Sequence, residues 1–249
     1  LLVRNQVNSA IYFLDKKVLN FIPKNTYADW VTDVFPNIVG KIFAYASSEF
    51  IFDVGTTKRI NMARRKYINS KKFTIGSYLN KRKAIFIDRD GVINEEVNGV
   101  YNYQQLNILP KSHQAIKKIN NSEYLAICVT NQPGIAKGFF SINDLNTIHA
   151  KLDTDLVKSG AYLDDIFVCP HHPESGWKGE KLDLKKKCNC RKPMPGMFLE
   201  AEKCHNIRLP DSLIIGDSIC DIQAGKLLGM DTMLVLTGNG KKTKLKLMD

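Results

Sequence analysis

The sequence predicts an α/β domain in which helices cover both faces of a parallel β-sheet, over residues 81–249. Short continuous apolar runs recur along this part of the chain, and such runs are typical of strands that are buried on both faces. Segments with helical patterns separate the runs, and strands that alternate with helices favour a parallel sheet. The five expected strands lie at residues 84–87, 125–129, 166–168, 213–215 and 233–236.

Three segments between or after these runs carry helix signals. Ser141 followed by Asp144 resembles a capping box, Pro195 suits the first turn of a helix, and Gly229 is a typical residue just past a helix end. The expected helices span residues 141–158, 195–205 and 219–228.

Composition excludes several classes of protein. The 249-residue chain is 44% hydrophobic and 24% charged, as expected of a globular protein that can bury a core. No run of 18 or more apolar residues is present, so we expect no membrane association and a cytoplasmic location. The first residues lack an initiator Met and the layout of a signal peptide, which indicates a fragment whose N-terminal portion is missing.

The net charge of +11 is distributed unevenly. Residues 1–80 carry 12 Lys and Arg against 5 Asp and Glu, whereas residues 81–249 carry 24 against 20. The excess gathers at residues 64–66 and at Lys71 and Lys72, where no aromatic stacking platform accompanies it. We therefore interpret it as a solvated helix face and a linker, expect no nucleic-acid partner, and place a domain boundary at residue 80.

Polar residues follow the predicted strands at their carboxyl ends, where ligands bind in parallel sheets. Asp88 and Asp90 follow the first strand, Thr130 and Asn131 the second, and Asp217 the fourth. Two close carboxylates repel each other unless a cation or a proton lies between them, and carboxylates suit Mg²⁺. With Lys192 as a free cation nearby, the set is typical of phosphoryl-transfer sites.

Clustered Cys and His residues form a second candidate site. Cys169 is followed by His171 and His172, and Cys188 and Cys190 form a second pair. The loop between the pairs has little apolar content, so a structural Zn²⁺ would supply the order that packing cannot. The residue types alone leave His171 and His172 as alternatives, and a set of unrelated reduced thiols is the competing interpretation. We expect the other cysteines to be small core residues: Cys128, Cys204 and Cys220.

Several stretches resemble the motifs of a known superfamily. Asp88 to Val92, Thr130-Asn131, Lys192 and Gly216 to Asp221 are similar to the four motifs of the haloacid dehalogenase superfamily. The stretches Thr130 to Ala136, Cys169 to Pro173 and Cys188 to Pro193 resemble, more narrowly, the D-glycero-D-manno-heptose 1,7-bisphosphate 7-phosphatase family. The match extends in order over nearly all of residues 83–240 and implies a Rossmann-like domain of the haloacid-dehalogenase type.

The resemblance implies a role for each carboxylate. Asp88 would be the nucleophile that forms an aspartyl-phosphate, and Asp90 would protonate the leaving oxygen and then deprotonate water. Mg²⁺ would be held by the Asp88 carboxylate, the Asp90 backbone carbonyl and Asp217. These roles agree with the general requirements of covalent and acid–base catalysis.

The resemblance also implies the remaining site residues. Thr130 and Lys192 would stabilise the phosphoryl oxygens, while Asn131 and Arg191 would bind substrate. It selects His171 over His172 as the fourth Zn²⁺ ligand, with Cys169, Cys188 and Cys190. The segment Glu95–Tyr101 is longer than the substrate loop of the family, so sugar contacts stay unassigned.

Residues 1–80 resemble a different family. Asn8 to Asp15, Tyr27 to Trp30 and Phe52 to Thr56 are similar to the C-terminal third of sugar-1-phosphate nucleotidyltransferases, in which an acidic residue at the position of Asp53 helps to bind metal. The two resemblances together imply a bifunctional enzyme of nucleotide-heptose and lipopolysaccharide biosynthesis, acting on a small sugar bisphosphate. The alternatives are a histidinol-phosphate phosphatase and a catalytically silent sugar-phosphate-binding module.

Overall fold

The structure is a computed structural model that describes residues 8–44, 51–66 and 80–248. The chain divides into two compact units: Gln6–Ser47 forms one, and the rest of the chain forms the other. The predicted boundary at residue 80 adjoins residues 67–79, which lie outside the described part and include Lys71 and Lys72 of the expected linker. That boundary stays a prediction.

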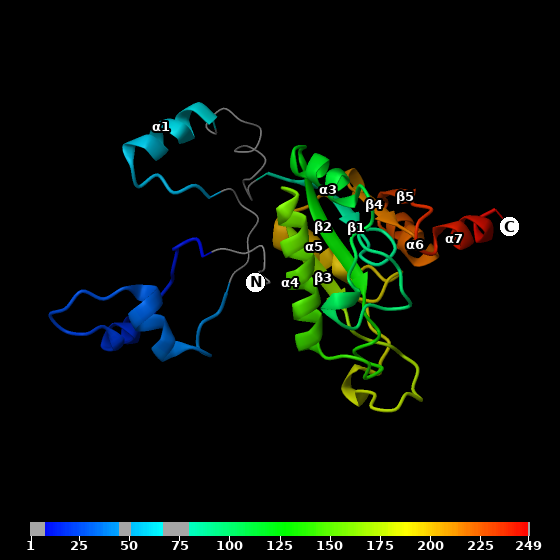
Figure 1. The fold of residues 1–249 in the computed structure, drawn as a ribbon, viewed down its shortest axis with the longest axis horizontal. Coiled ribbons are helices and arrows are strands. Elements are labelled where there is room, and N and C mark those ends of the chain that lie inside the picture. Colours follow the sequence, from blue (N-terminus) through cyan, green and yellow to red (C-terminus); the bar gives the residue numbers. More distant parts are fainter. Residues whose placement is uncertain (1–7, 45–50, 67–79, 249) are drawn as a thin grey trace. The chain divides into compact units, whose positions relative to one another are not determined.

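The five expected strands are all present and form one parallel sheet (Figure 1). Its order is β3-β2-β1-β4-β5, so β1 lies at the centre with β2 on one side and β4 on the other. This arrangement confirms the predicted fold class, and β5 begins and ends two residues earlier than expected. The strands are β1 (Lys83–Ile87), β2 (Tyr124–Asn131), β3 (Asp165–Cys169), β4 (Leu213–Gly216) and β5 (Asp231–Leu234).

The expected helices are also present. Ser141 and Asp144 form the predicted capping box, and Pro195 is the N-cap of its helix rather than a first-turn residue. Two further helices begin without a capping side chain, at Lys111 in a left-handed conformation and at Asn239, and neither was predicted. Among the described residues of the larger unit, the helices are α1 (Thr57–Lys66), α3 (Ser112–Asn120), α4 (Ile142–Lys158), α5 (Gly196–His205), α6 (Ile219–Leu227) and α7 (Gly240–Lys246), with short 3-10 helices η4 (Tyr103–Gln105), η5 (Leu182–Leu184) and η6 (Leu209–Asp211).

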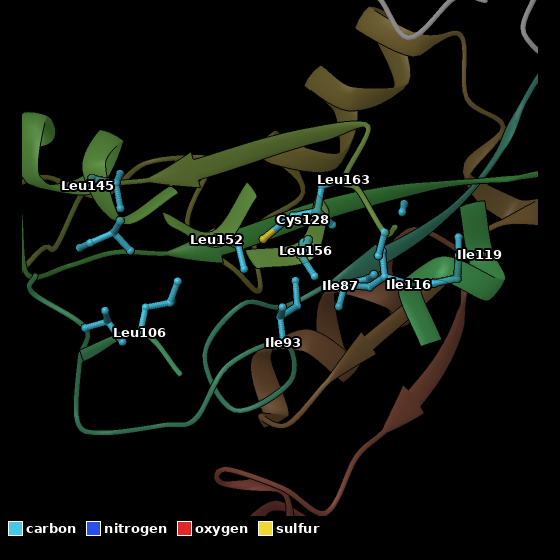
Figure 2. Packing of buried hydrophobic residues seen from close by; sticks show 14 of the residues in the cluster. Ile87, Ile93, Leu106, Ile116, Ile119, Cys128, Leu145, Leu152, Leu156 and Leu163 are labelled. Carbon is cyan, nitrogen blue, oxygen red and sulfur yellow. The ribbon is translucent and has the colours of Figure 1, made fainter. Parts of the chain in front are cut away.

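Alternate residues of the strands pack into two separate apolar clusters. Ile87 of β1 lies in the cluster that α3 and α4 cover, which Figure 2 shows with Cys128, Leu152 and other side chains. Phe86, its neighbour, lies in the opposite cluster and contacts Phe198 of α5 at a ring-centroid distance of 5.0 Å. Burial on both faces explains why the strands are continuous apolar runs, and it leaves only the strand ends for polar chemistry.

The smaller unit contains three short helices among its described residues, η1 (Lys16–Phe21), η2 (Trp30–Val34) and η3 (Phe35–Ile38). Val34 and Ile38 are buried, and the rings of Tyr12 and Phe35 meet edge to face at 4.9 Å. In the described part of the whole chain, no helix is both long and apolar enough to cross a membrane.

Candidate active site

A pocket of about 290 Å³ opens among residues that follow the carboxyl ends of β1, β2 and β4. Parallel sheets bind ligands at this edge, where the strand order switches direction. Every predicted phosphoryl-transfer residue lies at the pocket. Its lining comprises Asp88, Asp90, Glu96, Thr130, Asn131, Pro133, Arg191, Lys192, Asp217, Ser218, Cys220 and Asn239.

Lys192 is the buried cation of the pocket. Its ammonium lies 2.9 Å from Asp88 Oδ1 and 2.7 Å from Asp221 Oδ1, and it donates to the Val129 carbonyl at 2.8 Å. Asp88 is itself held at the end of β1, where its N–H donates to the Ile215 carbonyl of β4. Asp88 and Lys192 were predicted site residues, whereas no role was predicted for Asp221, which is fully buried on the first turn of α6.

The carboxylates of the pocket fit a divalent cation. Ligand oxygens of Asp88, Asp217 and Asp221 all lie within 4.8 Å of one another, and Lys192 is the ammonium that pairs with two of them. Burial raises the pKa of Asp88, against the opposing effect of Lys192, and burial also raises the pKa of Asp217. Three crowded carboxylates beside one ammonium carry excess negative charge, and an oxygen-only donor set of this kind suits Mg²⁺.

Electrostatic pairing also fixes the charge of Lys192. Burial acts to lower the pKa of its ammonium, but Asp88 and Asp221 raise it, so that the net pKa lies well above that of an ordinary lysine. The side chain is therefore a permanent positive charge at the floor of the pocket.

Asp90 is surrounded by hydrogen-bond donors. Arg89 binds both of its carboxylate oxygens, Asn94 Nδ2 donates to Oδ1 at 2.9 Å, and Gln132 Nε2 donates to Oδ2 at 2.8 Å. Gln132 Nε2 also lies 2.8 Å from Thr130 Oγ1, which links Asp90 to the end of β2. No role was predicted from sequence for Arg89, Asn94 or Gln132.

Asn131 contacts the backbone on either side of the Lys192 side chain. Its Oδ1 accepts from the Lys192 N–H at 3.0 Å, and its Nδ2 donates to the Lys192 carbonyl at 3.2 Å. This pairing positions Lys192 against β2. Asn131 also lines the pocket, where a substrate could reach it. Its assignment to substrate binding stays a prediction.

Two further lining residues were not assigned from sequence. Glu96 lies in the segment Glu95–Tyr101, for which no sugar contacts were predicted. Burial, together with the nearby charge of Asp90, raises the pKa of Glu96. Cys220 is partly buried at the pocket, 3.0 Å from Ser218 Oγ. Cys204 is exposed on α5, so the expectation that both would be core residues is wrong, whereas Cys128 is fully buried as expected.

The predicted Cys and His ligands come together in space. Cys190 Sγ lies 3.1 Å from Cys169 Sγ, 3.3 Å from Cys188 Sγ and 3.2 Å from His171 Nδ1. All four ligand atoms lie within 4.8 Å of one another, as the corners of a tetrahedral Zn²⁺ site do. His172 instead packs edge to face on Trp177, with ring centroids 5.0 Å apart.

A parallel α/β fold with clustered carboxylates, a buried lysine and a strand-end threonine defines the class of phosphate-ester hydrolases that use a cation. Comparison with known proteins makes this specific. The HAD-hydrolase-like family profile matches residues 189–249. The chain is 38% identical over 162 residues to the D-glycero-beta-D-manno-heptose-1,7-bisphosphate 7-phosphatase of Bordetella bronchiseptica, which covers 65% of this chain and 84% of that protein. It is 40% identical to the alpha-anomer enzyme of Photorhabdus laumondii, over 64% of this chain and 86% of the relative.

Solved structures agree with this result. The D,D-heptose 1.7-bisphosphate phosphatase of B. bronchiseptica, in complex with magnesium and phosphate, superposes with a TM-score of 0.59 at 37% identity and covers 66% of this chain and 86% of its own. A putative HAD-like phosphatase of Mesorhizobium loti gives 0.58 at 31% identity, over 62% and 72%. The chain therefore belongs to the haloacid-dehalogenase-like phosphatase family and is a phosphoric monoester hydrolase, and magnesium dependence is typical of that family.

Proposed function

We propose that this phosphatase removes the 7-phosphate of D-glycero-D-manno-heptose 1,7-bisphosphate through an aspartyl-phosphate on Asp88. The observation that carries the chemistry is the joint placement of Asp88, Asp90 and Lys192 around one pocket. The substrate class rests on the similarity to heptose bisphosphate phosphatases over most of their length.

In the first step, an oxygen of the Asp88 carboxylate attacks the phosphorus, and the bond from phosphorus to the sugar oxygen breaks. Asp90 donates a proton to that leaving oxygen. Lys192 Nζ and Thr130 Oγ1 stabilise charge on the transferred group, because both lie at the pocket beside the nucleophile. Splitting the displacement into two steps lowers each barrier.

In the second step, Asp90 takes a proton from a water molecule, which attacks the aspartyl-phosphate and releases inorganic phosphate. Arg89, Asn94 and Gln132 orient the Asp90 carboxylate for both proton transfers. Asp88 is thereby regenerated.

Mg²⁺ would be held by Asp88, Asp217 and the Asp90 backbone carbonyl, and Asp221 contributes charge beside them. When bound, it neutralises the phosphoryl oxygens and the nucleophilic carboxylate. A second ion, a structural Zn²⁺, would be held by Cys169, His171, Cys188 and Cys190. Because Arg191 directly follows Cys190, the Zn²⁺ site would also fix a substrate-binding cation.

We further propose that residues 1–80 derive from a sugar nucleotidyltransferase and that the phosphatase acts in nucleotide-heptose biosynthesis. Support comes from the sequence resemblance around Tyr27 to Trp30 and at Asp53. In the structure, Asp53 pairs with the exposed Arg59 and accepts from the Gly55 N–H at 2.9 Å.

The proposal is tested by measuring phosphate release from both anomers of heptose 1,7-bisphosphate, from heptose 7-phosphate and from histidinol phosphate. We expect the highest kcat/KM with a heptose bisphosphate, and we expect Asp88→Asn to remove turnover while keeping the thermal transition. A histidinol phosphate preference would refute the heptose substrate, and full Mg²⁺-dependent activity of Asp88→Asn would refute the mechanism.

A further inference from the structure

The loop between β5 and α7 encloses one oxygen of Asp217. The main-chain N–H of Asn239 donates to Asp217 Oδ2 at 2.6 Å, and the side-chain Nδ2 of Asn239 approaches the same oxygen at 3.3 Å. No hydrogen bond joins the described residues to Oδ1 of Asp217. The two oxygens of this carboxylate therefore have different environments.

Two glycines complete the enclosure of Oδ2. Gly91 and Gly238 both have positive φ angles, of 79° and 52°, and a Cβ atom on either one would overlap Asp217 Oδ2. Thr237 Oγ1 donates to the Gly91 carbonyl at 2.6 Å, which fastens the loop to the turn that follows Asp88 and Asp90. The loop thus contacts both the carboxylate and the segment that carries the nucleophile.

We propose that Thr237 and Asn239 are positioning residues for the cation site: they hold Asp217 Oδ2 so that Oδ1 alone faces the cation. This inference rests on the proposed function, in which Asp217 is a ligand. A ligand whose second oxygen is occupied binds in one orientation only, and hydrogen bonds of this kind tune metal affinity.

The main-chain N–H of Asn239 makes the shorter contact, so the decisive variant must remove that group. Asn239 has a φ of −83°, which is close to the angle that proline imposes, so Asn239→Pro fits the backbone at this residue while its ring Cδ takes the place of the N–H hydrogen and displaces Asp217 Oδ2. Asn239→Ala is the matched control, because it keeps the N–H and removes only the 3.3 Å contact. Thr237→Val removes the loop tether without changing the shape of the side chain.

The experiment titrates each purified 249-residue chain with Mn²⁺, as a paramagnetic substitute for Mg²⁺, and follows free Mn²⁺ by electron paramagnetic resonance. We expect Asn239→Pro to weaken binding by about 10-fold or more, Thr237→Val to weaken it less, and Asn239→Ala to have the smallest effect. Thr147→Val, which removes a hydroxyl-to-carbonyl bond of the same kind on the exposed face of α4, should bind as wild type does.

Thermal melting in EDTA identifies any variant that fails to fold. If Asn239→Pro does not fold, the Mn²⁺ affinity of Thr237→Val, compared with that of Thr147→Val, tests the inference by itself. Wild-type affinity in folded Asn239→Pro or in Thr237→Val would overturn the inference. Asp217→Asn separates the ligand role of Asp217 from the positioning role of the loop. If Asp217→Asn binds Mn²⁺ normally, the ligand assignment fails; if it loses Mn²⁺ while the loop variants keep it, only the role of the loop fails.

Discussion

Arg89, which is fully buried, binds both carboxylate oxygens of its neighbour Asp90, with Nη2 at 2.9 Å from Oδ2 and Nε at 3.1 Å from Oδ1. Its remaining nitrogen, Nη1, lies 3.3 Å from His149 Nε2 on α4. The guanidinium therefore joins the proposed acid–base residue to the helix that covers one face of the sheet. A planar fork of donors is required for this geometry, because a lysine ammonium cannot reach both oxygens in the same way.

Replacing Arg89 with lysine keeps the charge and removes the fork. We expect Arg89→Lys to lower kcat by about 10²-fold, because proton transfer depends on the orientation of Asp90, and to change KM little. Steady-state kinetics with the preferred substrate provide the measurement.

Arg208→Lys is the matched control, since Arg208 is an exposed arginine that pairs with Asp211 at 3.4 Å, and it should keep wild-type kcat. Equal kcat in Arg89→Lys and wild type would show that the fork has no part in orienting Asp90. Comparison of thermal transitions separates a loss of orientation from a loss of folding.

The strands and the strand-end residues could be predicted from sequence because they depend on local pattern. Buried strands are apolar runs; Asp88 and Asp217 directly follow β1 and β4, and Thr130 is the next-to-last residue of β2. The α3 helix was missed because it begins at Lys111 in a left-handed conformation without a capping side chain. Position in sequence alone could not show that the Asn239 loop approaches Gly91.

Arg89 and Asp221 were missed for a different reason. Both lie in stretches that resemble family motifs, but a charged residue in a loop or in a first helical turn is usually solvated, and only tertiary packing buries these two completely. Its spacing from Ser218 could have placed Asp221 in the capping box at the start of α6, but not its burial, since Asp144 forms the same kind of capping box on α4 and is exposed.

Arg191 and Lys192 are adjacent but should affect different kinetic parameters. We expect Arg191→Ala to raise KM for a bisphosphate more than for heptose 7-phosphate, because a guanidinium suits an uncleaved phosphate at the pocket. Lys192→Ala should lower kcat with either substrate, because Nζ lies 2.9 Å from Asp88, the proposed nucleophile. Kinetics of both variants with both substrates provide the comparison, and an undiminished bisphosphate preference in Arg191→Ala would contradict the role given to Arg191.

The Cys and His cluster should contain one Zn²⁺ per chain after purification without added metal. We expect Cys188→Ser to lower both the Zn²⁺ content and the Tm, because the metal would order the loop between the two ligand pairs. Elemental analysis and thermal melting measure these quantities. Cys204→Ser, at an exposed thiol outside the cluster, should change neither, and a zinc-free wild type with normal stability would refute the site.

Asp164 should make stability depend on pH. Burial raises its pKa from 3.8 to about 6, although the Ala126 N–H donates to its carboxylate and opposes the shift. A raised folded-state pKa gives stability that is complete below pH 3.8 and is lost as the pH rises through about 6. Relative to Asp164→Asn, wild type should therefore lose roughly 1 kcal/mol between pH 5 and pH 7.5. Urea unfolding of both proteins at the two pH values measures the difference, and an unchanged or reversed difference would contradict it.

The order of strands in the sheet has a consequence for synthesis on the ribosome. In the sheet, β4 pairs with β1 on the side opposite β2. The surroundings of Asp88, at the end of β1, are therefore completed by residues that are translated much later. The β1–β2 half can pair early, but the carboxylates and the loop around Asp217 join only once the chain has emerged as far as Asn239. A nascent chain would therefore expose Asp88, the proposed nucleophile, long before the pocket is complete, and catalytic competence would require synthesis to have passed Asn239.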